Sequence, residues 1–175
     1  MRRLMLLRHA KSDWSTPGRP DRERVLSPRG ESAAPLLGRY LAEQGLVPQH
    51  AIVSVAERTR QTWQRLGKAV TGPPSVTFDD RIYEASPLDI LTAIADIPAA
   101  VESLLVVGHN PGLQSLALAL AGSGSGKARR TLAEKFPTAG LAVIDFDLPD
   151  WKSLEPGSGR LERFITPRAI GGDED

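Results

Sequence analysis

The sequence predicts an α/β fold, a three-layer α/β/α sandwich with a mostly parallel central sheet. Short apolar runs alternate with segments whose apolar residues recur at helical spacing. The runs at residues 4–7 and 104–107 are apolar throughout, which is typical of parallel strands buried on both faces. With 175 residues, 41% of them hydrophobic, the chain can form one domain with a sizeable core. We expect that domain at residues 1–170, followed by a disordered acidic tail at 171–175.

The first elements are a buried strand at residues 3–7 and a polar loop at 11–25 that contains Pro and Gly. The pair Ser27-Pro28 then predicts a helix start, because Ser can cap a helix and Pro suits its first position. Pro35 lacks an N–H and crowds the preceding turn, so we expect a kink there or a helix regular only beyond it. Gly45 is expected to end this helix.

The next segments predict a strand at residues 51–55 and a helix at 57–70, closed by the Thr-Gly-Pro-Pro turn at 71–74. Residues 76–78 are a further candidate strand. The pair Ser86-Pro87 repeats the cap-and-proline helix start. The apolar faces of the two helices are expected to carry Trp63, Leu66 and Val70 in the first and Leu88, Leu91, Ile94 and Ala95 in the second.

Pro98 is expected to stop the second of these helices, and a buried strand at 103–107 precedes a helix at 111–121. Residues 122–126 alternate Gly and Ser, which predicts a flexible loop. A short helix is expected at 128–136. The last two strands are predicted at 140–146 and, with the character of an edge strand, at 160–165.

The composition excludes several classes of function. The net charge is +1, from 22 basic and 21 acidic residues, so no field strong enough to hold nucleic acid is expected. The absence of cysteine removes disulfides, zinc–thiolate sites and cysteine nucleophiles. No apolar stretch approaches the roughly 20 residues of a membrane span. The apolar run after Met1-Arg2-Arg3 is too short for a signal peptide. We therefore expect a soluble, cytoplasmic protein with no nucleic-acid or membrane partner.

The first candidate motif is Arg8-His9, at the end of the first strand. Ligands of open α/β sheets bind at the carboxyl ends of the strands. A neutral imidazole is a good nucleophile toward phosphorus, and an adjacent positive charge keeps it neutral by lowering its pKa. The Arg8 guanidinium offers a planar fork of donors for phosphate oxygens. The alternative, a capping histidine beside a surface arginine, stays open on this motif alone.

The second candidate motif is Gly108-His109-Asn110-Pro111-Gly112, at the end of the strand at 103–107. Asn110 can cap the following helix, whose amino terminus presents N–H groups to an anion. By itself this motif favours an ordinary strand-to-helix turn with an incidental histidine. Its pairing with Arg8-His9 reverses that balance and indicates phosphoryl chemistry.

Arg58 lies in the first turn of its helix, where a positive charge opposes the helix dipole, so a functional reason for it is plausible. Arg60 lies two residues on, roughly on the opposite side, and is interpreted as solvated. His50 is interpreted as a surface residue. The three tryptophans are interpreted as packing residues: Trp14, Trp63 and Trp151.

Glu84 is either a general acid or simply a charge near the next helix start. Lys11 and Asp13, in the loop after His9, are close enough in sequence to reach the site, although a solvated loop is the simpler interpretation. We predict Lys11, Asp13 and Asn110 as substrate-binding residues. Glu84 is preferred to Asp13 as the proton donor.

The motifs at Arg8-His9, 54–62 and Gly108-His109 together resemble the histidine phosphatase superfamily, also called phosphoglycerate mutase-like. The segment 7–14, Leu-Arg-His-Ala-Lys-Ser-Asp-Trp, is similar to the start of the SixA-type phosphohistidine phosphatases. The resemblance covers the chain from Arg3 to about Phe146. Four further motifs occur in the matching order, at residues 26–30, 83–86, 107–112 and 136–140.

The resemblance implies a phosphoglycerate mutase-like fold and a role for each matched residue. His9 would be the nucleophile that carries the phosphoryl group. Arg8, Arg58 and His109 would bind the phosphoryl oxygens through the transition state. No metal or cofactor would be needed, because the cationic pocket stabilises the charge. Water would then hydrolyse the phosphohistidine intermediate, and Glu84 is the best match to the family's general acid.

One departure from the wider superfamily is Ala10-Lys11, where a glycine and an acidic or amide residue are frequent; the SixA-type branch accommodates it. The leading hypothesis is a metal-independent phosphatase acting on phosphohistidine in signalling proteins, such as a histidine phosphotransfer domain. The imidazole leaving group of phosphohistidine departs more readily than an alkoxide, so a strong general acid is less necessary for this substrate. The short chain leaves little room for a cap, although the loops at 11–25 and 122–135 could close over a ligand.

Two alternatives stay open. One keeps the chemistry but changes the substrate to a small phosphomonoester or sugar phosphate. The other is a non-catalytic module that binds phosphate or a phosphoprotein, against which the presence of both His9 and His109 argues.

Overall fold

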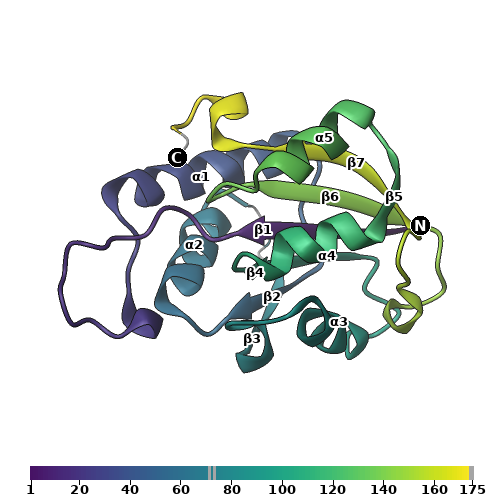
Figure 1. The fold of residues 1–175 in the computed structure, drawn as a ribbon, viewed down its shortest axis with the longest axis horizontal. Coiled ribbons are helices and arrows are strands. Elements are labelled where there is room, and N and C mark those ends of the chain that lie inside the picture. The colour runs from purple at the N-terminus through teal and green to yellow at the C-terminus, as the bar shows by residue number, and fades with distance from the viewer. Residues whose placement is uncertain (71, 73, 174–175) are drawn as a thin grey trace.

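The computed structural model describes residues 1–70, 72 and 74–173. A seven-stranded sheet forms the middle layer, in the order β3-β2-β4-β1-β6-β7-β5 (Figure 1). The pairs β1–β4, β2–β4, β2–β3 and β5–β7 are parallel, and β6 is antiparallel to both of its neighbours. The strands are β1 (Arg2–Arg8), β2 (His50–Ser54), β3 (Ser75–Asp79), β4 (Ser103–Gly108), β5 (Ala121–Gly124), β6 (Leu141–Phe146) and β7 (Gly159–Ile165).

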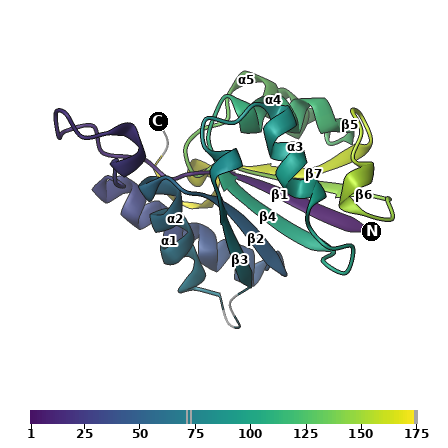
Figure 2. The same ribbon diagram turned by 90° about the horizontal axis from the view of Figure 1, so that it is seen from below.

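Helices cover both faces of the sheet. They are α1 (Pro28–Glu43), α2 (Glu57–Gly67), α3 (Pro87–Ala95), α4 (Gly112–Leu120) and α5 (Gly126–Glu134). Short 3-10 turns lie at Asp21–Glu23, Asp80–Ile82, Trp151–Ser153 and Pro167–Ile170. Figure 2 shows α1 and α2 on one side of the sheet and α3, α4 and α5 on the other. The predicted three-layer α/β/α fold with a mostly parallel sheet is confirmed. Across the described part of the chain, no helix is long and apolar enough to cross a bilayer.

The alternation of side chains along each strand divides the core in two. In β1, Leu4 and Leu6 pack with the residues of α3, α4 and α5, whereas Met5 and Leu7 pack with those of α1 and α2. All four are fully buried. β1 therefore lies in the interior of the sandwich, as its unbroken apolar run predicts. The carboxyl end of β1, which His9 directly follows, is fixed by packing on both faces.

Helix α1 begins and ends where the sequence indicates. The Ser27 hydroxyl accepts a hydrogen bond from the Gly30 N–H, and Gly45 follows the helix with a φ of 67°. The prediction of a helix regular only beyond Pro35 is wrong, because α1 runs without a break from Pro28 to Glu43. A proline in a helix removes one hydrogen bond, and the packing of Leu37 and Leu41 against the sheet outweighs that local cost.

The predicted flexible loop at 122–126 is also wrong, because Ala121–Gly124 forms strand β5, which pairs with β7. As a result β7 is not an edge strand; β5 and β3 occupy the two edges. A Cβ on Gly122 would lie 2.0 Å from the carbonyl oxygen of Gly157. The glycine that predicts flexibility is instead what lets two backbones approach closely.

Two other helices differ from the expectation in detail. α2 ends at Gly67 rather than at residue 70. The predicted turn at 71–74 falls partly outside the described residues, at 71 and 73. In α3, Leu88 is 71% exposed and the buried face is formed by Ile90, Ala93 and Ile94. The proposed boundary of the domain and the disorder of its tail stay predictions, and residues 174–175 lie outside the described residues.

Candidate active site

The carboxyl ends of β1, β2 and β4 meet at one edge of the sheet, because these three strands are parallel neighbours. His9 directly follows β1, Ser54 ends β2, and His109 directly follows β4. The two histidine rings lie with their centroids 5.3 Å apart. Open α/β sheets bind their ligands at this end of the strands.

His9 is held in a defined tautomer. Its backbone N–H donates to the carbonyl of Gly108 at 3.0 Å, and its own carbonyl accepts from the Ala139 N–H. The side-chain Nδ1 lies 2.7 Å from the Ala10 carbonyl. Since a carbonyl only accepts, Nδ1 carries the proton and Nε2 keeps its lone pair. His9 is therefore placed as a nucleophile rather than as an acid.

The pKa of His9 lies well below its ordinary value of 6.5. Burial is the main cause, and the charges of Arg58 and Arg8 act in the same direction, while the hydrogen bond to Ala10 opposes them. The imidazole is consequently neutral at physiological pH, which is the form that can attack phosphorus.

Arg8 lies at the end of β1, next to the amino end of the loop that follows α5. Its Nη1 donates to the Phe136 carbonyl at 3.0 Å, and Asn110 donates to the same carbonyl at 3.2 Å. The Ala139 N–H donates to the Arg8 carbonyl. Ala139 itself has a φ of 58°, in the left-handed region. Such backbone strain at a non-glycine residue is frequent at functional sites.

Arg58 enters the site from the second position of α2. It shares the buried face of that helix with Thr62 and Leu66, at four-residue spacing. The Thr62 hydroxyl donates to the Arg58 carbonyl and accepts from the Ala10 N–H, which connects α2 to the segment after His9. The guanidinium is almost fully buried, and its Nη2 donates to His109 Nδ1 at 3.3 Å.

His109 is neutral in this arrangement. Its Nδ1 accepts from Arg58, so Nε2 carries the proton and donates to the Ser54 hydroxyl at 2.7 Å. Burial, and then the positive charge of Arg58, lowers the pKa of His109 to about 3. In the absence of a ligand, the His109 ring therefore acts as a hydrogen-bond acceptor for Arg58.

Sequence reasoning missed three residues that complete this site: Asp21, Arg24 and Tyr83. The Asp21 carboxylate accepts from Arg24 Nη2 at 2.9 Å, from Arg58 Nη2 at 3.1 Å and from the Tyr83 hydroxyl at 2.5 Å. Partial burial opposes ionisation, but these hydrogen bonds outweigh it and hold the pKa of Asp21 well below its usual range. The Arg24 side chain is buried and also bonds to Ser12.

The site is built to receive an anion. The Nε atoms of Arg24 and Arg58 are buried and have no hydrogen-bond partner within the described part of the chain. Leaving a buried donor unsatisfied costs roughly 1–3 kcal/mol, more for a charged group, so such groups mark a place where a ligand supplies the acceptor. An anion with several acceptor oxygens, such as a phosphoryl group, fits these donors.

The other predicted site residues are placed differently. Glu84 is exposed, and its carboxylate has no hydrogen bond or ion pair to another described residue. The backbone of Glu84 has a φ of 52°, in the left-handed region. Asp13 accepts from the Ser15 N–H at 2.9 Å, and the Ser15 side chain, followed by this backbone contact, holds the pKa of Asp13 below its usual range. The Lys11 carbonyl supports the start of α1 by accepting from Ser27. Asn110 Oδ1 accepts from the Gln114 N–H in the first turn of α4, but the N-cap of that helix is Pro111, so Asn110 lies one residue before the predicted cap position.

Arg60 and His50 lie outside the site, as interpreted. Arg60 is half-buried rather than fully solvated, because its guanidinium packs on Phe78 at 4.2 Å. His50 bonds to Ser75 and Thr77 at the amino end of β2. Trp63 and Trp151 are buried, as predicted.

The interpretation of Trp14 as a packing residue is wrong. Its side chain is 73% exposed, and the Arg24 guanidinium lies 3.6 Å from the ring centroid. The loop that carries Trp14 projects from the body of the molecule beside the carboxyl end of β1 (Figures 1 and 2). An aromatic residue therefore lies on the outer side of the site.

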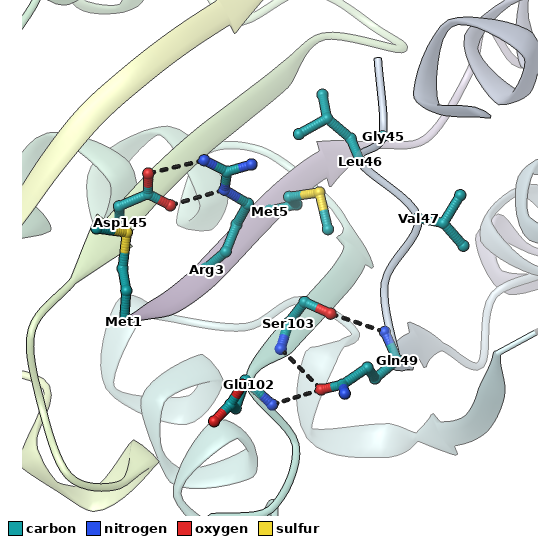
Figure 3. Close-up of a pocket in the computed structure, with 10 residues that line it drawn as sticks. All are labelled: Met1, Arg3, Met5, Gly45, Leu46, Val47, Gln49, Glu102, Ser103 and Asp145. Carbon is teal, nitrogen blue, oxygen red and sulfur yellow. Dashed lines mark hydrogen bonds and ion pairs between the residues drawn. The ribbon is translucent and has the colours of Figure 1, made fainter. Parts of the chain in front are cut away.

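A separate hollow of about 320 Å³ lies at the opposite, amino-terminal end of β1 and β4 (Figure 3). Several of its polar groups bond to one another. Arg3 makes two hydrogen bonds to Asp145, at 2.7 and 2.8 Å, and Gln49 Oε1 accepts from the N–H groups of Glu102 and Ser103. The one arginine that lines this hollow, Arg3, is thus paired with a carboxylate, whereas Arg24 and Arg58 each keep a buried Nε without a partner among the described residues.

A model of the histidine phosphatase superfamily (branch 1) matches residues 4–91, about half of the chain. The chain therefore belongs to the histidine phosphatase superfamily, which supports a phosphatase activity. The match includes Arg8, His9, Arg58 and Glu84, whereas His109 lies beyond it. Within the superfamily, the chain is of the SixA type, as the following solved structures show.

An Agrobacterium tumefaciens structure assigned to the SixA phosphohistidine phosphatases is 32% identical, with a TM-score of 0.80 over 95% of this chain and 98% of that chain. A structure from Nakamurella multipartitia with the same assignment is 28% identical, with a TM-score of 0.82 over 95% and 96%. An uncharacterised Mycobacterium leprae protein is 35% identical over 93% of this chain and its own full length.

Proposed function

We propose that this protein is a metal-independent phosphatase that uses His9 as a covalent phosphoryl carrier and acts on phosphohistidine in proteins. The observation that carries the proposal is the state of His9. A buried, neutral imidazole presents an Nε2 lone pair beside arginines that still have donors to offer. A nucleophile and its charge-stabilising groups are thus assembled before the substrate arrives.

In the first step, His9 Nε2 attacks the phosphorus atom. A P–N bond forms on His9 as the bond to the leaving group breaks, and the leaving nitrogen keeps the electron pair and takes a proton from solvent. In the second step, water attacks the phosphorus of phosphorylated His9. A P–O bond forms, the P–Nε2 bond breaks, and His9 returns to its neutral state as phosphate leaves and the water proton passes to solvent.

Arg8, Arg58 and His109 stabilise the transferred group. The two arginines supply fixed positive charge that does not depend on pH. His109 is neutral in the free site, and the arrival of a dianion raises its pKa, since a nearby negative charge favours the imidazolium. Its Nδ1 can then change from an acceptor of Arg58 into a donor to a phosphoryl oxygen.

Two features support phosphohistidine as the substrate. The solved structures most relevant here are assigned to phosphohistidine phosphatases. In addition, neither Glu84 nor Asp13 forms a hydrogen bond with His9 or His109 in the part of the chain that the structure describes. The carboxylate that does lie in the site, Asp21, accepts from Tyr83, Arg24 and Arg58, and these hydrogen bonds lower its pKa, so it is ionised and has no proton to donate. An imidazole leaving group needs less protonation than an alkoxide, so a site whose nearby carboxylate is ionised suits it.

The test uses a histidine phosphotransfer domain carrying radioactive phosphohistidine. We expect the unmodified enzyme to release phosphate and to acquire an acid-labile label. His9→Ala is expected to lose the label and at least 1000-fold in turnover, since a covalent route loses its nucleophile. His50→Ala is the matched control, because His50 lies at the opposite edge of the sheet, and it is expected to keep full activity.

Three outcomes would contradict the proposal in different ways. Full turnover by His9→Ala would exclude the covalent mechanism. Faster turnover of small phosphomonoesters or sugar phosphates than of the phosphoprotein would favour the small-molecule substrate. Binding of the phosphoprotein without turnover by the folded, unmodified protein would favour a binding module.

A further inference from the structure

We propose that Asp21 is a positioning residue, which fixes the guanidinium groups of Arg58 and Arg24 so that each turns its Nε–H toward the phosphoryl group. The inference rests on the proposed function and extends it to a residue outside the four matched to the family. It assigns Arg24 as a further ligand of the phosphoryl oxygens.

The first argument is the way Asp21 binds Arg58. Nη1 of Arg58 donates to the Asp21 backbone carbonyl at 2.7 Å, and Nη2 donates to its carboxylate at 3.1 Å. One residue therefore holds both terminal nitrogens of the guanidinium. Because the guanidinium is planar, fixing two nitrogens fixes the direction of the third. That third nitrogen, Nε, is the buried donor without a partner.

The second argument is that both terminal nitrogens of Arg24 are also held, one of them by Asp21. Its Nη2 donates to the other carboxylate oxygen of Asp21 at 2.9 Å, and its Nη1 donates to the Ser12 hydroxyl. Trp14 covers the guanidinium plane. Here too Nε is buried and has no partner among the described residues. Two arginines from different elements share one carboxylate and keep the same donor available.

The third argument concerns Asp21 itself, whose side chain is 45% exposed and lies at the start of a one-turn helix in the projecting loop. The Tyr83 hydroxyl donates to the carboxylate, and the Tyr83 ring packs edge-on against His109 at 5.5 Å between centroids. Asp21 is thus connected to α2, to the segment after β3 and, through Tyr83, to the histidine after β4.

A carboxylate this close to an anion site has an electrostatic cost, because it repels the phosphoryl group. Its presence is explained if orientation of the arginines contributes more in the transition state than the repulsion removes. The two effects have opposite signatures. Loss of orientation lowers kcat, whereas loss of repulsion strengthens the binding of phosphate and lowers KM.

The test compares Asp21→Asn with the unmodified enzyme, using the radioactive phosphoprotein in single-turnover and steady-state experiments. Asn keeps the shape of the side chain but cannot accept from two arginines as an anion. We expect kcat and the rate of His9 labelling to fall by roughly 10- to 100-fold, with KM unchanged or lower. Tyr83→Phe, which removes one contact to Asp21, is expected to show a smaller loss in the same direction.

Glu23→Gln is the matched control. It makes the same change of charge two residues away, in the same exposed turn, and its carboxylate has no hydrogen bond or ion pair with the residues the structure describes. We expect its kcat and KM to equal those of the unmodified enzyme. Circular dichroism spectra and melting temperatures of all variants verify that the fold is intact.

The outcomes separate this inference from the proposed function. If the unmodified enzyme is never labelled, the proposed function fails. If it is labelled and Asp21→Asn is labelled at the same rate, only the positioning role fails. A rise in kcat/KM of Asp21→Asn, with stronger inhibition by inorganic phosphate, would show that Asp21 competes with the substrate instead.

Discussion

At the scale of single residues, the site depends on two histidines that the protein keeps uncharged. His9 is buried and His109 is partly buried, each beside arginines, and the pKa of each is lowered. Each ring also has a hydrogen bond that selects its tautomer: His9 Nδ1–H donates to the Ala10 carbonyl, and His109 Nδ1 accepts from Arg58. The same burial that prepares the nucleophile therefore makes the folded state sensitive to acid.

The sign of that sensitivity follows from linkage. The unfolded chain protonates His109 below its ordinary pKa of 6.5, whereas the folded chain does so only near pH 3. The unfolded state thus binds more protons in this window, and stability falls as the pH falls through it. Between pH 7 and pH 5 His109 alone removes about 2 kcal/mol from the free energy of unfolding.

His109→Asn tests this effect, because Asn does not titrate. The free energy of unfolding is measured with urea at pH 7 and at pH 5 for both proteins. The decrease between the two pH values is expected to be about 2 kcal/mol smaller for His109→Asn than for the unmodified protein. Aspartates with lowered pKa values contribute mainly below this range, so they do not obscure the comparison. Equal pH dependence in the two proteins would mean that His109 is not kept neutral by the fold.

The sequence predicts the histidines and their two arginines because strand ends and a helix start place them independently of the loops. Asp21 and Arg24 could not be predicted in the same way. They lie in a segment without apolar periodicity, and their contacts depend on the path of the loop between Ser12 and Leu26, which pair as an isolated bridge. The position of Glu84 between Arg58 and His109 in the chain predicts a general acid. The direction of its side chain, however, depends on a left-handed backbone that a sequence pattern does not reveal.

At the scale of elements, β5 shows how backbone pairing can override composition. Its four residues carry almost no apolar side chains, so no hydrophobic pattern indicates a strand. The strand forms because Gly122 and Gly124 allow the backbone to approach Gly157 and Leu161 closely. The sequence rules for strands rest on side-chain burial, which is why they predict a flexible loop here.

Gly122→Ala is expected to destabilise the protein by roughly 2–3 kcal/mol, because its Cβ would lie 2.0 Å from a backbone oxygen and β5 would have to move. Gly67→Ala provides the control. It lies in α2, and a Cβ there has no neighbour within 4 Å, so we expect a gain of up to about 1 kcal/mol. The measurement is urea unfolding at pH 7. A neutral Gly122→Ala would contradict close pairing of β5.

At the scale of the whole molecule, the hydrophobic core packs on the two faces of one sheet, and a projecting loop lies beside the end of the sheet that carries His9 and His109. Trp14 is exposed on that loop, next to Arg24. Exposed tryptophans beside arginines are frequent among residues that dominate protein–protein binding. This suits the proposal that the substrate is a phosphorylated protein, which would reach the site with a surface of its own.

Trp14→Ala is therefore expected to lower kcat/KM for a phosphohistidine protein by about tenfold, with little change for a small aryl phosphate. Leu88→Ala is the control, because Leu88 is exposed to a similar degree but lies on α3. Steady-state rates on both substrates give the comparison. An equal loss on both would show that Trp14 acts only by supporting Arg24.

The central place of β1 in the sheet has a consequence for how the molecule opens over time. The amide of His9 donates to the Gly108 carbonyl, between strands that are covered on both faces, so we expect it to exchange with solvent only when the entire domain unfolds. Asp21 lies in an exposed one-turn segment whose amides can open locally. We therefore expect His9 to keep its position when the segment around Asp21 opens and closes, so that substrate entry need not disturb the strand that precedes the reacting nitrogen.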